Sequence, residues 1–339
     1  MKILVTGGAG FIGSHLVRQL MEAGDDVISL DNLSTGLREN LPEGARLEVM
    51  DTHDDKVEDL FRQEHFAAVV HLAAQTLVSD SMVDPENDMY QNIAGTVHIM
   101  ECCRKYGVKR VIFSSSAATY GDVDEKALPV QETLPQIPLS FYGLTKMTVE
   151  KYLALYHMAF GIHYVVLRFA NVYGERQGDG GEGGVISIFA KRLAKGQDIT
   201  IFGNGKQTRD FVYAGDIARG IRLALTTPNA DTCYNLSTQT EISLNELVTI
   251  LPALPEKKSP ILRPCQRRGH LSLLPFQRKG SEKPPLDPGS ISGRRTETDL
   301  PVLPETMKYE KCPLEKVGRF FIDRRRHDIE RPNPVMLTL

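Results

Sequence analysis

The sequence lacks several features that would assign it to a particular class. It has no apolar run of about 18 residues, so we expect no transmembrane helix. Its five cysteines form no Cys-x-x-Cys pair, which favours reduced thiols and a cytoplasmic location. No group of histidines and cysteines has the spacing of metal ligands, so we predict no metal site. The N-terminal MKILVTGGAGFIG is too short and too glycine-rich for a signal peptide.

The net charge of the chain argues against some classes of partner and indicates none. The net charge of the whole chain is −3, which gives no reason to expect nucleic acid or an anionic membrane as a partner. The charge is unevenly spread, however. Residues 1–250 contain 22 Lys and Arg against 32 Asp and Glu, whereas residues 251–339 contain 18 against 11. Thirteen of the 19 prolines lie in that last segment. We therefore expect residues 251–339 to pack poorly.

What the sequence does contain is a regular alternation of strand and helix patterns. Short apolar runs rich in β-branched residues predict strands at 2–6, 25–31, 46–51, 66–74, 110–116 and 163–174. Helical spacing lies between them, most clearly at 14–24, 55–64, 92–107 and 142–161. The alternation predicts an α/β fold, with a Rossmann-type, doubly wound parallel sheet covered by helices on both faces.

A glycine-rich turn joins the first strand to the first helix and contains Gly7, Gly10 and Gly13. Glycine lets such a turn close and lets a pyrophosphate approach the backbone, where the helix N-terminus offers amide donors. Asp31 ends the second strand, 18 residues after Gly13. A carboxylate there accepts hydrogen bonds from an adenosine ribose and repels a 2′-phosphate. The pattern predicts NAD rather than NADP as the cofactor.

Tyr142 and Lys146 lie four residues apart at the start of a predicted helix, so they share one face. A free tyrosine has a pKa of about 10, and a nearby ammonium favours the phenolate. Such a tyrosine can remove a proton from a sugar hydroxyl near neutral pH. The Tyr-x-x-x-Lys spacing is common by chance, and it gains weight here from the glycine turn and from the serines that end the strand at 110–116.

Eight segments together give a specific resemblance to a known family: VTGGAGFIGSHL, LDNLSTG, VVHLAA, NIAGT, VIFSSSAATYG, YGLTK, LRFANVYG and TRDFVYAGDIA. They span about residues 1–240. In them the chain resembles the NAD-dependent epimerase/dehydratase family, which are extended short-chain dehydrogenase/reductases that act on sugar nucleotides. Within this family it most resembles the branch that epimerises UDP-hexoses at C4.

The resemblance implies a role for each matching residue. The catalytic residues would be Ser116, Tyr142 and Lys146, with Ser116 bonded to the sugar 4-hydroxyl and Lys146 bonded to the nicotinamide ribose. The UDP-sugar would be held by Ser116, Tyr142, Asn171 and Arg209. The NAD-binding residues, besides Tyr142 and Lys146, would be Gly7, Gly10, Phe11, Ile12, Gly13, Asp31, Asn32, Asp51, Leu72, Ala73, Ala74 and Asn92.

The two residues after Ser116 distinguish between reactions of the family. Related 4,6-dehydratases carry Asp-Glu there as acid and base, and decarboxylases usually carry Glu at the second position. This chain has Ala117 and Ala118. Elimination of water lacks a proton shuttle without a carboxylate, whereas oxidation at C4, rotation of the keto-sugar and hydride return do not need one. The alanines therefore favour an epimerase, although they also fit simple packing below the nicotinamide.

The resemblance ends near residue 250, where the family continues with an Arg-x-Gly-Asp segment and a cap over the substrate. Codons can be chosen for two stretches of this chain, 269–283 and 291–302, so that moving the reading frame by one nucleotide in the same direction gives family-like sequence in both. We hypothesise that the chain leaves the family reading frame between about Ile250 and Ile261. The encoding gene would test this, because codons that cannot yield Gly-Asp-Ile-Tyr-His-Ser exclude it. The other interpretation is a genuine basic tail.

The expected organisation follows from these segments. Residues 1–174, with a returning segment at about 208–238, would form the NAD-binding domain. Residues 175–207 and 239–250 would form a smaller, interleaved substrate-binding part, incomplete after about 250. The family resemblance also implies a homodimer through the helices at 92–107 and 142–161. Two other functions stay open: another sugar-nucleotide modifier, such as a UDP-glucuronate 4-epimerase, and a non-catalytic NAD-binding protein.

Overall fold

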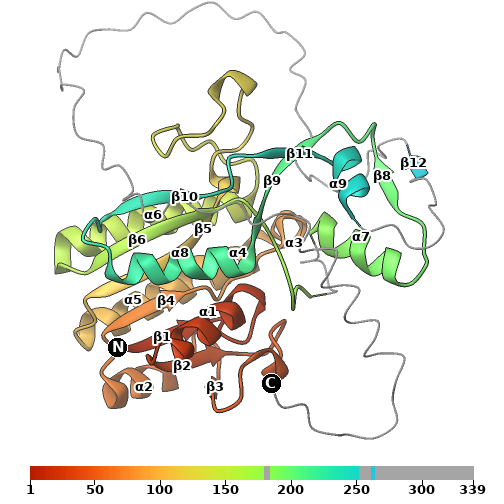
Figure 1. The fold of residues 1–339 in the computed structure, drawn as a ribbon. Helices are drawn as coiled ribbons and strands as arrows, with labels where there is room; N and C mark the ends of the chain where they lie inside the picture. The colour runs from red at the N-terminus through yellow and green to blue at the C-terminus, as the bar shows by residue number, and fades with distance from the viewer. Residues whose placement is uncertain (179–183, 252–260, 264–339) are drawn as a thin grey trace, which may run out of the picture.

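A seven-stranded sheet forms the centre of the computed structural model, which describes residues 1–178, 184–251 and 261–263. Its strand order is β10-β6-β5-β4-β1-β2-β3, and all neighbouring pairs are parallel (Figure 1). The strands are β1 (Lys2–Thr6), β2 (Asp26–Asp31), β3 (Arg46–Val49), β4 (Ala68–His71), β5 (Arg110–Ser116), β6 (His163–Phe169) and β10 (Thr232–Leu236). The order reverses between β1 and β4, as in a doubly wound sheet, so the predicted fold class is confirmed.

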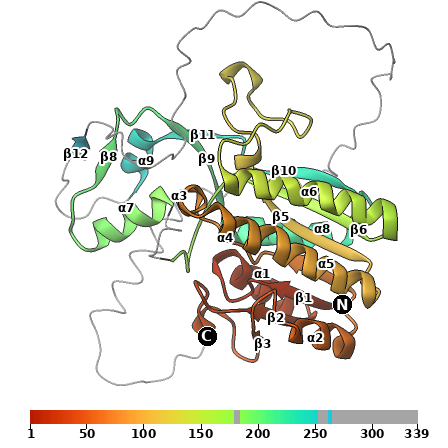
Figure 2. The same cartoon turned by 180° about the vertical axis from the view of Figure 1, so that it is seen from behind.

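Helices cover both faces of this sheet, because successive strand residues point to opposite sides. Ile3 and Val5 pack with α1 (Phe11–Glu22) and α8 (Ala214–Thr226) on one face. Leu4 packs on the other face with α2 (Lys56–Glu64), α5 (Gly95–Lys105) and α6 (Phe141–Phe160). Figure 2 shows α5 and α6 side by side on that second face. Strands buried on both sides explain why these segments read as continuous apolar runs in the sequence.

Short helical elements surround the carboxyl ends of the central strands. Two helices, α3 (Val78–Val83) and α4 (Pro85–Met89), precede a π-helical turn, η2 (Tyr90–Ala94), which leads directly into α5. Three 3-10 turns are η1 (Arg38–Asn40), η3 (Ala117–Thr119) and η4 (Glu125–Ala127). The helix predicted at 92–107 therefore begins earlier in the structure, as a π-turn that continues from α4.

A smaller unit lies beside the main sheet (Figure 1). It has one sheet of order β11-β9-β7, with β7 (Asn171–Tyr173), β9 (Thr208–Tyr213) and β11 (Glu241–Ser243), and a pair formed by β8 (Thr200–Phe202) and β12 (Ile261–Arg263). Two helices complete it, α7 (Val185–Ala194) and α9 (Leu244–Ile250). Ser243 caps α9 in a capping box with Glu246. The unit has its own small core, which includes Ile186, Phe189, Phe211 and Leu247.

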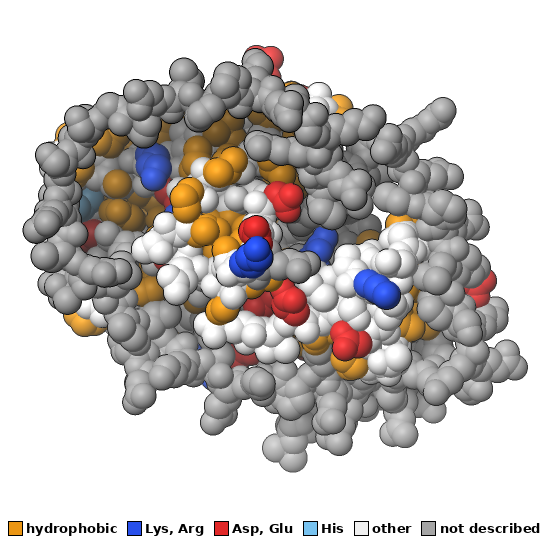
Figure 3. All heavy atoms as spheres, turned by 90° about the horizontal axis from the view of Figure 1, so that it is seen from above, with side chains coloured by type: hydrophobic (Ala, Val, Ile, Leu, Met, Phe, Trp, Pro, Cys, Tyr) orange, Lys and Arg blue, Asp and Glu red, His pale blue; other side chains and the backbone are white. Residues whose placement is uncertain are grey.

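The predictions for the C-terminal segment can be checked only at a few positions. Residues 252–260 and 264–339 lie outside the described part, so the poor packing and the change of reading frame stay predictions. Of the helices within the described part, none combines the length and the apolar character needed to cross a bilayer. Seen from above, the described surface carries charged side chains of both signs beside apolar ones (Figure 3).

Candidate active site

The carboxyl ends of three adjacent strands bring several of the predicted site residues into one row. Thr6 at the end of β1 pairs with His71 at the end of β4, and His71 pairs with Phe113 of β5. The glycine turn follows Thr6, residues 72–74 follow His71, and the serines of β5 follow Phe113. Ligands of doubly wound sheets bind outside the carboxyl ends of the strands, at the point where the order reverses. The row therefore lies where a dinucleotide site is expected.

Backbone packing in the glycine turn leaves no room for side chains. Gly7 has a positive φ of +68°, and a Cβ there would lie 2.8 Å from the amide nitrogen of Ala73. A Cβ on Gly13 would lie 2.0 Å from the carbonyl oxygen of Gly7, so the start of α1 can approach the turn only with glycine. Gly10 is the N-cap of α1 and makes no side-chain cap, and the first turn of this helix has no acidic residue. These N-terminal amides suit a phosphate group.

Asp31 is engaged by the turn itself. Its carboxylate accepts hydrogen bonds from the amides of Ala9 at 2.9 Å and Leu33 at 2.9 Å. Burial raises the pKa of Asp31, and the amides of Leu33, Ala9 and Gly10 offset part of that increase because they stabilise the charged form. The carboxylate thus ties the end of β2 to the glycine turn, at the edge where the ribose of a dinucleotide is predicted.

Asn32 and Asp51 contact each other beside Asp31. The Asn32 side-chain amide donates to Asp51 at 2.8 Å, and the His53 ring lies 2.6 Å from the other Asp51 oxygen. Desolvation raises the pKa of Asp51, but these hydrogen bonds from His53 and Asn32 outweigh it, so the pKa is lowered. The His53 ring also stacks on Tyr90, with 4.0 Å between centroids. The surroundings of Asn32 and Asp51, both predicted to bind NAD, therefore include two rings that the sequence motifs did not indicate.

Leu72, Ala73 and Ala74 follow β4 and face the glycine turn through their backbone. The Thr6 hydroxyl accepts hydrogen bonds from the amides of Leu72 and Ala73, both at 3.2 Å. The same hydroxyl lies 2.7 Å from Nδ1 of His71, whose Nε2 lies 3.0 Å from the Thr96 hydroxyl. Burial lowers the pKa of His71 to about 3, so the ring is neutral at physiological pH. This buried chain of polar groups fixes the segment next to Gly7.

Asn92 lies behind this row and holds other residues in place. Its side chain is buried, accepts from the amide of Gln75 at 2.8 Å and donates to Asp88 and Thr145 at 3.2 Å each. Thr145 also donates to Asp88, at 2.9 Å. Burial raises the pKa of Asp88, and bonds from Thr145 and Gln75 offset part of the effect. Asn92, Asp88 and Thr145 thus connect η2 and α4 to α6, the helix that carries Tyr142 and Lys146.

Lys146 extends from α6 to the end of β5. Its ammonium donates to the backbone carbonyl of Ser114 at 2.9 Å and lies 5.8 Å from the centre of the Tyr142 ring. The side chain is buried, which lowers the pKa of Lys146 to about 8 because the charged form loses solvation, and the negative charge of Asp88 partly opposes this. A lysine in this state keeps its charge at neutral pH and brings it next to the phenol.

The segments that carry Ser116 and Tyr142 approach each other closely through their backbones. Gly143 follows Tyr142, and a Cβ at Gly143 would lie 2.6 Å from the carbonyl oxygen of Ala118. The Ser116 hydroxyl accepts a hydrogen bond from the Ala118 amide at 3.1 Å, which begins η3. α6 packs directly against η3 and β5. The structure therefore brings Ser116, Tyr142 and Lys146 to one end of β5, in the row with the glycine turn.

A buried ion pair lies directly behind the serines of β5. Arg168 of β6 forms two bonds to Glu150 of α6, at 3.0 and 2.6 Å, and the Ser115 hydroxyl donates to Glu150 at 2.5 Å. Arg168 also donates to the Tyr120 hydroxyl, at 2.7 Å. Desolvation lowers the pKa of Arg168, but the bonds to Glu150 raise it by more than desolvation lowers it. The net pKa is raised, so the guanidinium stays charged. The pair joins α6, β5 and β6 beneath the site.

Two of the four predicted substrate residues, Asn171 and Arg209, lie apart from this row, in the smaller unit. The side-chain amide of Asn171, on β7, donates to the carbonyl of Asp210 on β9 at 3.2 Å, next to Arg209. Arg209 donates to the carbonyl of Thr208 at 2.6 Å. Its pKa is lowered by desolvation alone, with no opposing carboxylate, so in the described part of the chain its charge is uncompensated. A half-buried guanidinium of this kind can bind a phosphate.

Comparison with known proteins then identifies the family. A model of the "NAD dependent epimerase/dehydratase family" matches residues 3–237, which is well over half of the chain. The chain belongs to this family. It is accordingly an enzyme of the NAD-dependent epimerase/dehydratase type, and NAD is its cofactor, as the glycine turn and Asp31 predicted.

Individual relatives agree with this assignment. The chain is 46% identical over 250 residues to a putative UDP-glucose 4-epimerase of Methanocaldococcus jannaschii, a match that covers 74% of this chain and 81% of the relative. A UDP-glucose 4-epimerase structure from Thermotoga maritima with UDP-glucose is 39% identical, with a TM-score of 0.74 over 79% of this chain and 87% of that one. A Thermus thermophilus UDP-glucose 4-epimerase in complex with NAD is also 39% identical, with a TM-score of 0.72 over 80% and 88%.

The residues of this chain fit the cofactor of the family. The close backbone packing that only glycine allows at positions 7 and 13, the uncapped N-terminus of α1 and the carboxylate of Asp31 at the end of β2 suit a pyrophosphate and a ribose. Sequence reasoning missed three supporting residues, Asp88, Glu150 and Arg168. Asp88 precedes Asn92 by four residues, and Glu150 follows Lys146 by four, so helical spacing from the predicted site residues could have found two of them.

Proposed function

We propose that this protein is an NAD-dependent epimerase that inverts C4 of a UDP-hexose, of the UDP-glucose/UDP-galactose type, through a 4-keto intermediate. The observation that supports it most is the placement of the Lys146 ammonium, 5.8 Å from the Tyr142 ring and 2.9 Å from the Ser114 carbonyl, at the strand end that also carries Ser116. A phenol beside a charged lysine is a base for a sugar hydroxyl.

Each residue of this constellation has a distinct task in the proposed reaction. Tyr142 removes the proton of the 4-hydroxyl when C4 is oxidised and returns it when C4 is reduced. Ser116 hydrogen-bonds to the same oxygen and orients it. Lys146 stabilises the phenolate by its charge, since burial leaves the ammonium close to the ring and far from bulk solvent. Bound NAD supplies the acceptor and the donor of the hydride that these two half-reactions require.

Inversion also needs the keto-sugar to present its other face before reduction. Arg209 on β9 and Asn171 on β7 would hold the diphosphate, and the position of both residues in the smaller unit supports this role. If the diphosphate is held there and the sugar is not, the sugar can rotate about its phosphate linkage. Ala117 and Ala118 form the start of η3 and add no carboxylate to the site. This supports epimerisation over elimination of water.

The experiment is to incubate the purified protein with UDP-galactose and to measure UDP-glucose. The proposal predicts formation of the C4 epimer, in both directions, with no net accumulation of NADH. Conversion of UDP-glucuronate alone would assign the protein to that related epimerase instead. Accumulation of NADH without an epimer indicates a dehydrogenase. Retention of NAD without any turnover would show a non-catalytic NAD-binding protein, the result expected if residues 251–339 replace a required cap.

We also propose that residues 1–174, with a returning segment at about 208–238, bind NAD, and that 175–207 and 239–250 contribute to the sugar nucleotide site. Support comes from β10, which extends the main sheet beside β6, and from α8, which packs on α1. The small core around Phe189 and Leu247 supports a separate substrate-binding part. Activity is proposed to be impaired because the chain departs from its family after about residue 250.

The outer face of α6 supports a homodimer. Leu144, Tyr152, Leu155 and Met158 are exposed along this helix, with Met158 at 79% and Leu155 at 59%. An apolar helix face beside α5 (Figure 2) suits packing against a second copy. Size-exclusion chromatography with light scattering should give twice the chain mass, and Leu155→Glu should give the single-chain mass.

A cytoplasmic location is proposed from the cysteines. Cys102, Cys103 and Cys233 are free, and the first two are buried. Burial raises the pKa of Cys102 to about 11, which keeps the thiol protonated and unreactive. Free, unpaired thiols are typical of reducing compartments.

A further inference from the structure

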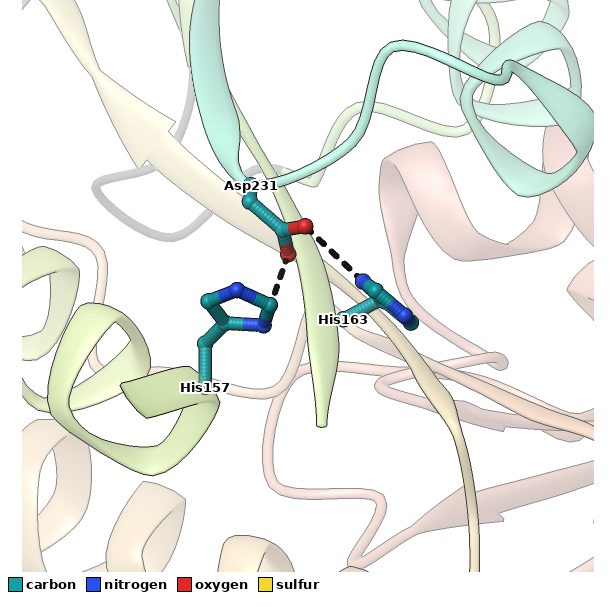
Figure 4. Close-up of side chains that lie close together, drawn as sticks. All are labelled: His157, His163 and Asp231. Atoms are coloured by element: carbon teal, nitrogen blue, oxygen red, sulfur yellow. Dashed lines mark hydrogen bonds and ion pairs between the residues drawn. The ribbon is translucent and has the colours of Figure 1, made fainter. Parts of the chain in front are cut away.

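Two histidines and an aspartate meet at the amino-terminal end of the main sheet. His157 lies in the last turn of α6, His163 begins β6, and Asp231 immediately precedes β10. Figure 4 shows both imidazole rings beside the Asp231 carboxylate, from three different elements. The Asp231 oxygens lie 3.2 Å from Nδ1 of His157 and 2.8 Å from Nδ1 of His163. The catalytic row lies at the opposite, carboxyl-terminal end of the strands.

The backbone around this cluster fixes the carboxylate. Asp231 has a φ of +62°, which is uncommon for a residue other than glycine. Its amide donates to the Tyr164 carbonyl at 2.6 Å, and the Tyr164 amide donates to its carboxylate at 3.1 Å. The backbone amide of His163 is bonded to the Lys109 carbonyl at 2.9 Å. Two of the three side chains therefore start from a backbone that hydrogen bonds between β6 and its neighbours hold in place.

The donor atoms are close enough to share one ion. One nitrogen from each imidazole and one carboxylate oxygen lie within 4.8 Å of one another. Zn²⁺ binds such atoms at about 2.0–2.2 Å, so two ligands of a tetrahedral ion lie about 3.3 Å apart. The distances of 2.8 and 3.2 Å to Asp231 are already near this value. Both distances and the 4.8 Å limit are compatible with one ion bound by all three groups.

The hydrogen bonding of His157 gives a second, independent observation. Its Nδ1 is shielded from solvent and has no hydrogen bond of acceptable geometry, although it faces the Asp231 carboxylate. A buried nitrogen without such a bond is costly, and a metal ion would satisfy it. The side chains of His157, His163 and Asp231 are 33%, 51% and 26% exposed, so water can reach the cluster as a further ligand.

We propose that His157, His163 and Asp231 bind a divalent transition-metal ion, with Zn²⁺ as the best match to two imidazoles and one carboxylate. Imidazole also suits Cu²⁺ and Ni²⁺, whereas Mg²⁺ and Ca²⁺ prefer oxygen ligands. The site is structural, because His157 and Tyr142 are separated by 15 residues, about 22 Å along α6. The ion joins the end of the catalytic helix to β6 and to the start of β10. The sequence did not indicate it, since the third ligand lies 68 residues after His163.

The test is a Zn²⁺ titration of the full-length, chelator-treated protein, followed by calorimetry and by the melting temperature. One ion per chain should bind and raise the melting temperature. In the variant His157→Gln/His163→Gln the affinity for Zn²⁺ should fall at least about 100-fold. Loss of a residue that only supports a metal ligand already lowers metal affinity about 10-fold to 100-fold, and this variant removes two ligands. The increase in melting temperature should also disappear.

Two controls keep the outcome decisive. His65→Gln removes an exposed histidine at the end of α2 and should leave both readouts as in the wild type. Co²⁺ titration should give the absorption of a coordinated ion in the wild type and lose it in the double variant. The proposal is overturned if the wild type binds no Zn²⁺, or if the double variant binds it within about threefold of the wild type, which would assign the binding to donors elsewhere, such as Cys265 and Cys312.

Discussion

The glycine turn and the surface around Arg209 differ in how their polar groups are used. At the turn, the Asp31 carboxylate accepts hydrogen bonds from the amides of Ala9 and Leu33, and the Thr6 hydroxyl accepts them from the amides of Leu72 and Ala73. Around Arg209, the described bond of the guanidinium goes to the neighbouring carbonyl of Thr208, and no carboxylate offsets its desolvation. The first region is organised by its own contacts, whereas the guanidinium of the second has no carboxylate partner within the described residues and therefore suits an anionic ligand.

This difference indicates which parts of the site should depend on a ligand for their order. A glycine turn that is already held by its own hydrogen bonds can keep a cofactor through many turnovers, because little conformational freedom is lost when the cofactor binds. A guanidinium without a carboxylate partner favours an anion that enters and leaves. Variants in the two regions should therefore separate retention of NAD from affinity for the sugar nucleotide.

Among the variants that compare the two regions, the largest effect on ligand binding is expected in the glycine turn. Gly13→Ala places a Cβ 2.0 Å from the Gly7 carbonyl oxygen, so α1 must shift away from the turn. NAD affinity should fall at least about 100-fold, equivalent to about 2.7 kcal/mol. The measurement is the NAD content of the purified protein and its affinity by calorimetry.

The matched control for the turn is Gly107→Ala. Gly107 also has a positive φ, of +75°, but a Cβ there meets no atom within 4 Å. It should cost about 1 kcal/mol of stability and leave NAD binding unchanged. Equal NAD affinity in Gly13→Ala and the wild type would contradict the binding of NAD at the glycine turn.

A smaller and different effect is expected at Arg209. Arg209→Gln removes the uncompensated charge, so KM for the UDP-sugar should rise about 10-fold to 100-fold, since bonds to charged groups contribute about 1.5–3 kcal/mol. NAD content should not change. Arg192→Gln, an exposed arginine of α7 bonded to the carbonyl of Asp198, is the control and should leave KM as in the wild type. If Arg209→Gln lost NAD instead, the division between the two regions would be wrong.

The smallest effect is expected at Asp88 of α4, whose charge acts on the pKa of Lys146 in α6. Asp88 raises the pKa of Lys146 against the effect of burial, which lowers it to about 8. Asp88→Asn should lower that pKa further, so the ammonium loses its proton at a lower pH. The alkaline decline of turnover should then begin at lower pH, with about a twofold to tenfold loss at pH 8. Turnover is measured across pH 6–9.

Glu86→Gln serves as the control for Asp88. Glu86 is an exposed residue of the same short helix and is not among the charges that act on Lys146. Its pH profile should follow that of the wild type. If the decline of turnover at alkaline pH began at the same pH in Asp88→Asn as in the wild type, deprotonation of Lys146 would not be its cause.

The main sheet could be predicted from the sequence because its strands are buried on both faces. β1 and β5 have the predicted bounds of 2–6 and 110–116, and each contains an unbroken run of apolar or β-branched residues, at 3–6 and 111–113. The segment predicted as one strand with its loop, 163–174, divides in the structure. β6 stays in the main sheet, whereas β7 pairs with β9 in the smaller one. Nothing local in the sequence marks Ala170 as the point of departure, because long-range pairing decides it.

The candidate site shows the same limit. The glycines, Tyr142 and Lys146 could be predicted because their spacing reflects a turn and one helix face. The pairs that fix them could not, since Asp88 meets Thr145 across 57 residues and Ser115 meets Glu150 across 35. Such partners depend on how α4, β5 and α6 pack, and several residue types would satisfy the same local pattern.

The most direct test of the central claim is the turnover of Tyr142→Phe with UDP-galactose, measured on protein that holds NAD. The phenol is proposed to carry the proton of the 4-hydroxyl, so kcat should fall about 10²-fold to 10⁴-fold while NAD stays bound. Tyr106→Phe, which removes a phenol bonded to Glu58 on the outer side of α5, should retain wild-type turnover. Wild-type turnover in Tyr142→Phe would contradict the account.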